Sequence, residues 1–417
     1  MNGLDATGIA VAVGSGAITP ALVAEHFLAR IGVDEPDIQA FVSFDAEAVR
    51  EQALQLEGCS GPLAGLPVGV KDIFDTADHP TEFYSPIYLG NRPSRDAHVV
   101  TLLRQAGAII MGKTHTTEFA YMNTGPTRNP LDLSCTPGSS SAGSAAGMAA
   151  GFFPLALGTQ TAGSLLKPAA YCGLFAFKPS FGLVSLEGVK PLAPSFDTVG
   201  WYGRSVRDLE RVAQVLIRGF PGVEVGRRPL RLGFCRTSRW SDVQPVVAQA
   251  IELAIARLGP LVSEVVLPEA FDGVFDDHQL INDCEGARSL AKEFQSHPEL
   301  LSDSTLAMIE RAKATSWEQE SAAKARLAQL APQLAQICQP FDAMLSVSCG
   351  MLAPVGLATT GPSDFIKFWG AFGLPQVNVP VMRGEGELPV GLQVMGAFRG
   401  DAPLLGTAQV IVNALVS

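Results

Sequence analysis

The stretch GTQTAGSLLKPAAYCG, residues 158–173, decides how the rest of the chain is interpreted. It holds one serine, Ser164, among small residues, with no acidic side chain, no histidine and a single lysine, Lys167. One explanation is structural, because a tight turn beside a core strand needs small residues. The other is chemical, because bare backbone N–H groups are wanted where negative charge develops during a reaction. The stretch alone does not separate these explanations, so the surrounding sequence must.

The composition indicates a large protein with few charges. Charged residues make up 17% of the 417 residues, against about 25% in typical soluble proteins, and hydrophobic residues reach 47%. This balance suits a large core in which both faces of a sheet are covered. The formal net charge of −11 argues against nucleic acid and anionic membranes as partners, since binding to either relies on Lys and Arg.

The cysteines and the apolar segments favour a soluble cytoplasmic protein. Seven cysteines are scattered without a C-x-x-C pair or zinc-like spacing, so we expect free thiols in a reducing compartment and no metal or cofactor. The first 20 residues lack the basic stretch of a signal peptide. The uncharged segment 133–166 is interrupted by prolines, which favours a buried core over a membrane helix.

The N-terminal half alternates predicted helices and strands. Thr19 and Pro20 open an amphipathic helix, and residues 45–58 form a second one. LPVGVKD, residues 66–72, is strand-like, and residues 98–107 predict a helix that leads into a buried strand at 108–111. Helix and strand in alternation favour an α/β architecture.

Residues 134–151, SCTPGSSSAGSAAGMAAG, have the composition of a flexible linker but not its context. They become Ala-rich and run directly into FFPLALGTQT, which has the pattern of a buried strand. We therefore interpret them as a Ser/Gly-rich loop that opens a small-residue helix packed on a sheet. Residues 225–340 carry more charge and show helical periodicity, which predicts a helical cap or insertion.

Two motif matches are set aside. Residues 107–114, GAIIMGKT, satisfy the P-loop expression, but their four middle residues are apolar and belong in a strand. Ser164 and Lys167 fit S-x-x-K, yet the companion motifs S-D-N and K-T-G are absent from the sequence. The dispersed histidines are expected to be solvated or satisfied in the core; they are His26, His79, His98, His115, His278 and His297.

Three separated pieces carry the chemistry: GVKD at 69–72, GSSSAGS at 138–144 and GTQTAGS at 158–164. In these pieces, and in GLFAFKPSFG at 173–182, the sequence closely resembles the amidase signature family. The resemblance covers residues 60–210, expected to be the catalytic core, and extends more weakly over 340–410. It implies a single domain over 1–417 with a large mixed β-sheet covered by helices on both faces. Strands in 340–417 would complete that sheet.

The resemblance implies a catalytic triad of Lys71, Ser140 and Ser164. Ser164 matches the nucleophile, and Ser140, 24 residues earlier, matches a bridging serine that follows a cis peptide bond. Lys71 matches the catalytic lysine, and the backbone amides of residues 161–164 match the oxyanion hole. The residues expected to contact the substrate are Ser139, Thr161, Ala162, Gly163 and Lys167.

Such a triad also has an independent physical reason. A serine hydroxyl is a poor nucleophile until a base takes its proton. A lysine can be that base when burial lowers its pKa and leaves the amine neutral. Ser140 can relay the proton, because a hydroxyl donates and accepts at once. The small residues around Ser164 then leave backbone amides free to reach the oxyanion.

The chain departs from the family pattern at several positions. Gln160 replaces an Asp, Ala162 and Ser139 replace glycines, and Leu166 replaces a common Arg. Lys167 comes directly after Leu166. In short members of the family that are similar to malonamidase, a basic residue at this position faces a substrate carboxylate. We therefore expect a small substrate with an acidic group near its amide. The alternative, that Lys167 is structural or exposed, stays open.

We expect an amide hydrolase that forms an acyl-enzyme on Ser164, acts without a cofactor and assembles as a homodimer. The alternative is a glutaminase-like subunit of a tRNA-dependent amidotransferase complex, against which the short chain argues. A catalytically silent binding protein is disfavoured, because the whole triad is present. The residues that select the substrate are expected in 225–340 and in TTGPSDFIKFWG at 359–370.

Overall fold

The computed structural model describes residues 3–223, 229–381, 384 and 386–416, and its strands form one mixed sheet. The strands in spatial order are β1 (Phe41–Phe44), β3 (Ile109–Thr114), β2 (Pro67–Lys71), β4 (Leu155–Gln160), β6 (Thr198–Gly203), β5 (Phe175–Lys178), β10 (Gln376–Val381), β11 (Val390–Met395), β9 (Ala343–Val347), β7 (Leu232–Phe234) and β8 (Val262–Glu264). The prediction of a large mixed sheet is confirmed.

The pairing of the strands joins distant parts of the chain. β2 lies parallel to both β3 and β4, whereas β4 and β6 are antiparallel. The C-terminal strand β10 pairs with β5, with Gln376 opposite Lys178. The segment 340–417 therefore adds its strands to the sheet that the N-terminal half begins.

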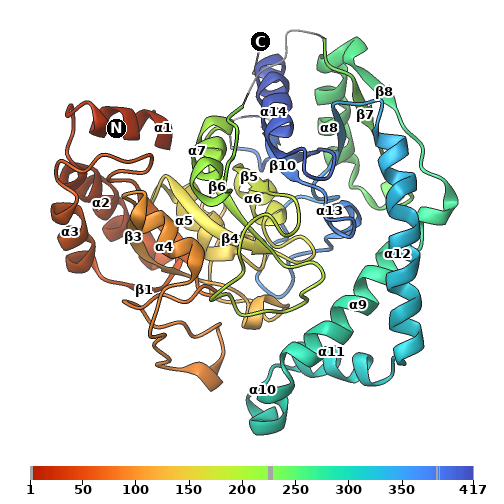
Figure 1. Ribbon diagram of the computed structural model, residues 1–417, viewed down its shortest axis with the longest axis horizontal. Helices are drawn as coiled ribbons and strands as arrows, with labels where there is room; N and C mark the ends of the chain where they lie inside the picture. Colours follow the sequence, from red (N-terminus) through yellow and green to blue (C-terminus); the bar gives the residue numbers. More distant parts are fainter. Residues whose placement is uncertain (1–2, 224–228, 382–383, 385, 417) are drawn as a thin grey trace.

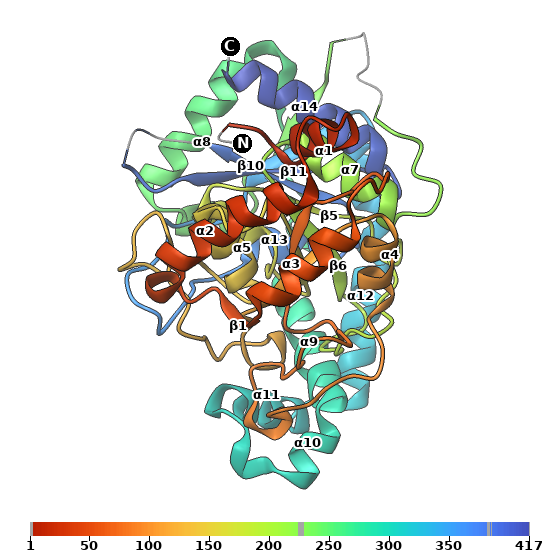
Figure 2. The same cartoon turned by 90° about the vertical axis from the view of Figure 1, so that its left-hand side faces the viewer.

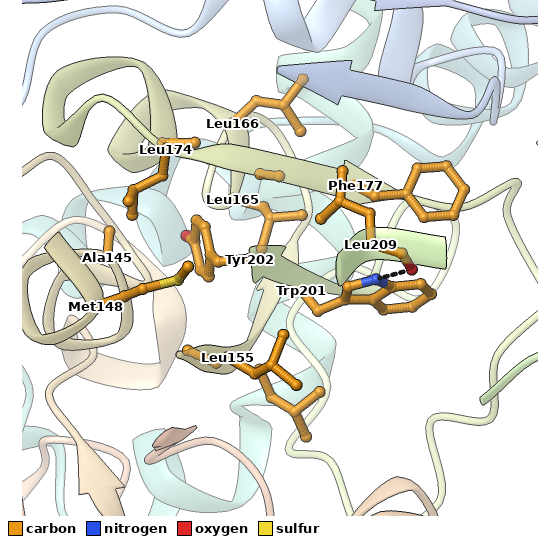
Figure 3. Close-up of a cluster of buried hydrophobic side chains, with 14 of the residues drawn as sticks. Ala145, Met148, Leu155, Leu165, Leu166, Leu174, Phe177, Trp201, Tyr202 and Leu209 are labelled. Carbon is orange, nitrogen blue, oxygen red and sulfur yellow. Dashed lines mark hydrogen bonds between the residues drawn. The ribbon is translucent and has the colours of Figure 1, made fainter. Parts of the chain in front are cut away.

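Helices cover this sheet from both sides (Figure 1). Neighbouring residues of a strand point to opposite faces, and Trp201 and Tyr202 of β6 show the two layers (Figure 3). Trp201 lies against α7 (Val206–Leu216), where its Nε1 donates to the carbonyl oxygen of Leu209 (2.9 Å). Tyr202 lies on the other side, toward the Met148 side chain of α5 (Ala142–Ala150).

The other helices of the N-terminal half follow their local sequence signals. They are α1 (Ala6–Gly14), α2 (Pro20–Ile38), α3 (Ala46–Gln55), α4 (His98–Gln105) and α6 (Leu166–Cys172). The Thr19 side chain caps α2 by accepting a hydrogen bond from the N–H of Leu22. The stretch that fits the P-loop expression forms the buried strand β3, and Lys113 within it forms an ion pair with Asp72 (2.9 Å).

Of the segment 225–340, residues 229–340 are described and build a mostly helical part of the molecule, while 225–228 lie outside the described residues. Its helices are α8 (Pro245–Leu258), α9 (Val274–Ser289), α10 (Ala291–Ser296), α11 (Asp303–Lys313) and α12 (Trp317–Cys338). Helices α11 and α12 both pack on α9, and this group extends away from the sheet (Figures 1 and 2). The same segment also contributes β7 and β8 at the edge of the sheet.

Two further α-helices lie in the C-terminal segment: α13 (Asp364–Gly370), which packs on α9, and α14 (Asp401–Val416), which packs on α7, α8 and β10. Within the residues that the structure describes, no helix combines the length and the apolar character needed to cross a bilayer.

Candidate active site

The candidate site begins where two parallel strands end. Lys71 is the last residue of β2 and is completely buried. Because β2 and β4 are parallel neighbours, their carboxyl ends lie at the same edge of the sheet. The Lys71 Nζ atom hydrogen-bonds to the hydroxyl oxygens of Thr159 on β4 (2.7 Å) and of Ser140 (2.8 Å).

Ser140 comes from the Ser/Gly-rich loop that leads into α5. The peptide bond between Ser139 and Ser140 is cis, and Ser140 is fully buried. Ser141 fixes the loop to β4, since its hydroxyl donates to the carbonyl oxygen of Thr159 (3.3 Å). A Cβ atom at Gly143 would lie 2.2 Å from the carbonyl oxygen of Ala40. The small residues therefore serve close packing, as the interpretation of this segment against a linker predicts.

Ser164 lies on the turn between β4 and α6, and Gln160 holds this turn. The side-chain oxygen of Gln160 accepts hydrogen bonds from the N–H groups of Leu165 (3.1 Å) and Leu166 (3.0 Å). Its amide nitrogen donates to the side-chain oxygen of Gln376 on β10 (2.8 Å). The two leucines are completely buried in the apolar core (Figure 3). Two departures from the family pattern, Gln160 and Leu166, thus have a structural reason.

The serine-bearing segments meet at a cavity of about 270 Å³. The N–H of Ser141 donates to the carbonyl oxygen of Ser164 (3.2 Å), which places the two serine segments side by side. A Cβ atom at Gly163 would come within 2.7 Å of Ser363, so this wall also requires a small residue. The predicted site residues that line the cavity are Ser139, Thr161, Ala162, Gly163, Ser164 and Lys167.

Burial changes the proton affinity of Lys71. Removal of the ammonium group from water lowers the pKa of Lys71 to about 7. The carboxylate of Asp197 opposes this shift, but burial is the larger effect. A substantial fraction of Lys71 is consequently neutral near pH 7, which a proton acceptor requires.

Lys167 is also buried, which excludes the idea that it is exposed. Its Nζ atom donates to the hydroxyl oxygen of Thr360 (3.0 Å) and to the carbonyl oxygen of Gly361 (2.9 Å). Burial lowers the pKa of Lys167 to about 8. Among the described residues, no carboxylate forms an ion pair with it. Ser139 shares a partner with Lys167, because the Ser139 hydroxyl also hydrogen-bonds to the Thr360 hydroxyl (2.7 Å).

Comparison with known proteins identifies the family. A family model described as Amidase matches residues 22–405, nearly the whole chain. The chain belongs to the amidase family. The prediction of an amidase is therefore confirmed at the level of the family.

Two curated relatives and one solved structure illustrate how similar this chain is to known proteins. A glutamyl-tRNA(Gln) amidotransferase subunit from Symbiobacterium thermophilum is 38% identical over 309 residues, which span 67% of this chain and 63% of that relative. The protein of the same name from Nitratidesulfovibrio vulgaris is 32% identical over 93% of this chain and 92% of its own length. A solved structure described as a crystal structure of amidase is 31% identical, with a TM-score of 0.90 and 99% of each chain covered.

The amidase cavity also contains residues that the sequence did not single out. Helix α9 contributes His278, Gln279 and Asn282, and the segment around α13 contributes Asp364 and Lys367. Both regions are those in which the sequence predicts substrate-selecting residues, but no short motif singles out the residues themselves. The signal in α9 was a pair of polar residues, His278 and Asn282, four apart on one helix face.

Two further residues escaped the sequence analysis, although they lie close to the triad positions. Thr159 contacts Lys71, and Asp197 accepts a hydrogen bond from the Thr161 hydroxyl (2.6 Å). Across the described residues, no group of three or more His, Cys, Asp or Glu side chains is arranged to hold a metal ion.

Proposed function

We propose that this protein hydrolyses the amide bond of a small molecule through an acyl-enzyme on Ser164. The observation that carries the proposal is the buried Lys71, whose Nζ atom lies 2.8 Å from the Ser140 hydroxyl beside the cavity that Ser164 lines. A lysine with a pKa of about 7 is a base at neutral pH, and a hydroxyl between base and nucleophile can pass a proton.

In the acylation step, the Ser164 hydroxyl attacks the amide carbonyl carbon. Its proton passes to Ser140, and the Ser140 proton passes to the neutral amine of Lys71. The carbonyl oxygen becomes an oxyanion, which the backbone N–H groups of residues 161–164 stabilise. The C–N bond then breaks, and the proton held by Lys71 returns through Ser140 to the leaving nitrogen. Ammonia or an amine departs, and an ester remains on Ser164.

In the deacylation step, water replaces the leaving amine. Lys71 takes a proton from this water through Ser140, and the resulting hydroxide attacks the ester carbon. Collapse of the second tetrahedral intermediate breaks the bond to the Ser164 oxygen, which recovers its proton through Ser140. The products are a carboxylic acid and the free enzyme. The residues that bind and orient the substrate in both steps are proposed to include Ser139 and Lys167.

An acidic substrate is the part of the proposal that rests on Lys167. Both groups that its ammonium contacts, the Thr360 hydroxyl and the Gly361 carbonyl, are neutral. A buried cation without a charged partner is costly, and an anion in the cavity would offset this cost. By contrast, Lys367 at the same cavity already pairs with Asp364 (3.1 Å). Lys167 is therefore the lysine that a substrate carboxylate would meet.

The substrate class is tested by a pair of amides of similar length, succinamate with a carboxylate and butyramide without one. Lys167→Met should raise KM for succinamate by about tenfold or more, since a charged hydrogen bond contributes about 1.5–3 kcal/mol. The KM for butyramide should change little. Lys313→Met is the control, because this lysine of α11 is half exposed and lies outside the cavity. An equal rise in KM for both amides would show that Lys167 is structural.

A second candidate function is favoured by the curated relatives, which carry the name of a glutamyl-tRNA(Gln) amidotransferase subunit. On this view the chain would release ammonia from glutamine inside a complex. The purified chain distinguishes the two functions. A small-molecule amidase releases ammonia from its substrate without a partner protein, whether it is a monomer or the expected homodimer. A component of a complex acts on glutamine and needs its partner for full activity.

The proposed reaction itself is tested by ammonia release from a panel of acidic, neutral, aromatic and urea-like amides plus glutamine. Release from one class that disappears in Ser164→Ala supports the proposal. Release that persists in this variant rejects Ser164 as the nucleophile.

A further inference from the structure

Thr161 opens the loop that leads from β4 to Ser164, and two side chains hold it. Its hydroxyl donates to Asp197 Oδ1 (2.6 Å), and its carbonyl oxygen lies 3.2 Å from His278 Nε2. Both partners are buried, and His278 is only 1% exposed. The first residue of the loop is thus held by one hydrogen bond to its side chain and one to its backbone carbonyl.

The contact between His278 and Thr161 determines which ring nitrogen carries the proton. A carbonyl oxygen only accepts hydrogen bonds, so Nε2 must be the donor. Burial lowers the pKa of His278 to about 3, so the ring is neutral at pH 7 and Nδ1 carries no proton. Nδ1 is buried and has no hydrogen-bond partner in the described residues. The ring is therefore a fixed donor to Thr161 and does not exchange protons with the site.

Asp197 and His278 form one unit through Phe196. The rings of Phe196 and His278 stack at 4.0 Å between centroids, with an angle of 16° between their planes. The next residue after Phe196 is Asp197, whose Oδ2 atom accepts a hydrogen bond from the N–H of Leu192 (2.8 Å). Helix α9 and the segment before β6 therefore meet at Thr161, and neither side chain is free to turn away.

We infer that Asp197 and His278 are positioning residues, which aim the amides of residues 161–164 at the developing oxyanion. This inference rests on the proposed function, because it assigns the loop a role in the same reaction. Donors in an oxyanion hole act only when they point at the right place, and a displacement of about 1 Å can lower a rate about 100-fold. Loss of either contact should therefore reduce the rate of the chemical step more than the binding of the substrate.

The experiment compares His278→Phe with His278→Gln. Phenylalanine keeps the stacking on Phe196 and removes the donor, whereas glutamine removes the ring and keeps an N–H near the position of Nε2. A fluorophosphonate probe reports on the loop without a known substrate. The Ser164 oxygen bonds to the phosphorus of the probe while the Ser164 proton passes through Ser140 to Lys71, negative charge develops on the phosphoryl oxygen, and fluoride leaves. The maximal rate of phosphonylation is measured together with the probe concentration that gives half of this rate.

His278→Phe should lower the maximal rate by about 10–100-fold and leave the half-saturating concentration within about threefold. His278→Gln should recover most of the rate. A wild-type rate in His278→Phe would overturn the inference. An equal loss in both variants would also overturn it, because packing rather than the hydrogen bond would then matter.

A second pair of variants tests the other contact and covers the case in which His278→Phe does not fold. Thr161→Val removes the hydroxyl that donates a hydrogen bond to Asp197, and Thr161→Ser keeps this hydroxyl. The valine variant should lose rate and the serine variant should keep it; equal rates would contradict the inference. If the wild-type chain is not phosphonylated at Ser164, the proposed function itself fails, which is a separate result.

Discussion

The β2–β4–α5–α6 region and the helical region α9–α12 contribute to the same cavity in different ways. The first brings Lys71 and Ser140 into direct contact and carries Ser164 on a turn bonded to Gln160. The second supplies α9 side chains to the lining of the cavity, namely His278, Gln279 and Asn282. Reaction chemistry requires particular groups at fixed positions, whereas a substrate wall can be built from many side chains. We therefore expect substitutions in the first region to affect all substrates and most substitutions in the second to affect selectivity.

The largest effect is expected at the centre of the first region. Lys71→Met keeps the volume of the side chain and removes the base, so kcat/KM should fall on the order of 10²–10⁴-fold for every amide tested. Lys313→Met in α11, where the lysine is half exposed and paired with Glu310, should leave kcat/KM within about twofold. Similar losses in both variants would break the comparison between the regions.

Gln160 should matter for stability to a degree that no exposed residue of the helical region does. Gln160→Leu leaves two buried N–H groups and the Gln376 side chain without their partner, which should lower the free energy of unfolding by about 3 kcal/mol. Gln333→Leu, on the exposed face of α12, should change it by less than about 0.5 kcal/mol. Urea denaturation measures both values, and equal values would show that the turn is not held by Gln160.

The pH dependence tests which group is the base. Lys71 acts as a base only when neutral, and its pKa is about 7. Activity should therefore reach its plateau about one pH unit above 7, be half of that near pH 7, and fall about tenfold per pH unit well below it. His278, with a pKa of about 3, cannot produce this change. The measurement is kcat/KM between pH 5 and 9 with butyramide, whose own charge is constant. A flat profile would contradict the assignment of Lys71.

A smaller effect is expected in α9, where Asn282 lines the cavity. Asn282→Ala should change the ratio of kcat/KM between succinamate and butyramide by up to about tenfold, the usual scale for one pocket contact. Steady-state kinetics on both amides give this ratio. If both values fell by the same factor, Asn282 would belong with His278 to the part of α9 that positions the catalytic loop, and the boundary between the two regions would move.

The sequence motifs of the first region made its place in the fold predictable. A lysine at a strand end, a Ser/Gly-rich loop and a serine on a turn are local patterns. The alternation of helices and strands favours an α/β architecture. The mixed sheet and the roles of Lys71, Ser140 and Ser164 are expected from the resemblance to the amidase signature family. The contacts to Thr161 and Lys167 are different in kind. His278 lies 117 residues from Thr161, and Thr360 lies 193 residues from Lys167. Only the packing of α9 and of the segment before α13 brings these residues together, and no short pattern records that packing.

The measurement that tests the central claim most directly is mass spectrometry of the intact chain and of its peptides after reaction with a fluorophosphonate. The account predicts one adduct per chain, on the peptide that contains Ser164, and none in Ser164→Ala. In Lys71→Met the adduct should form far more slowly. An adduct on another residue, or labelling of Ser164 at the same rate without Lys71, would contradict the claim that Lys71 activates Ser164 through Ser140.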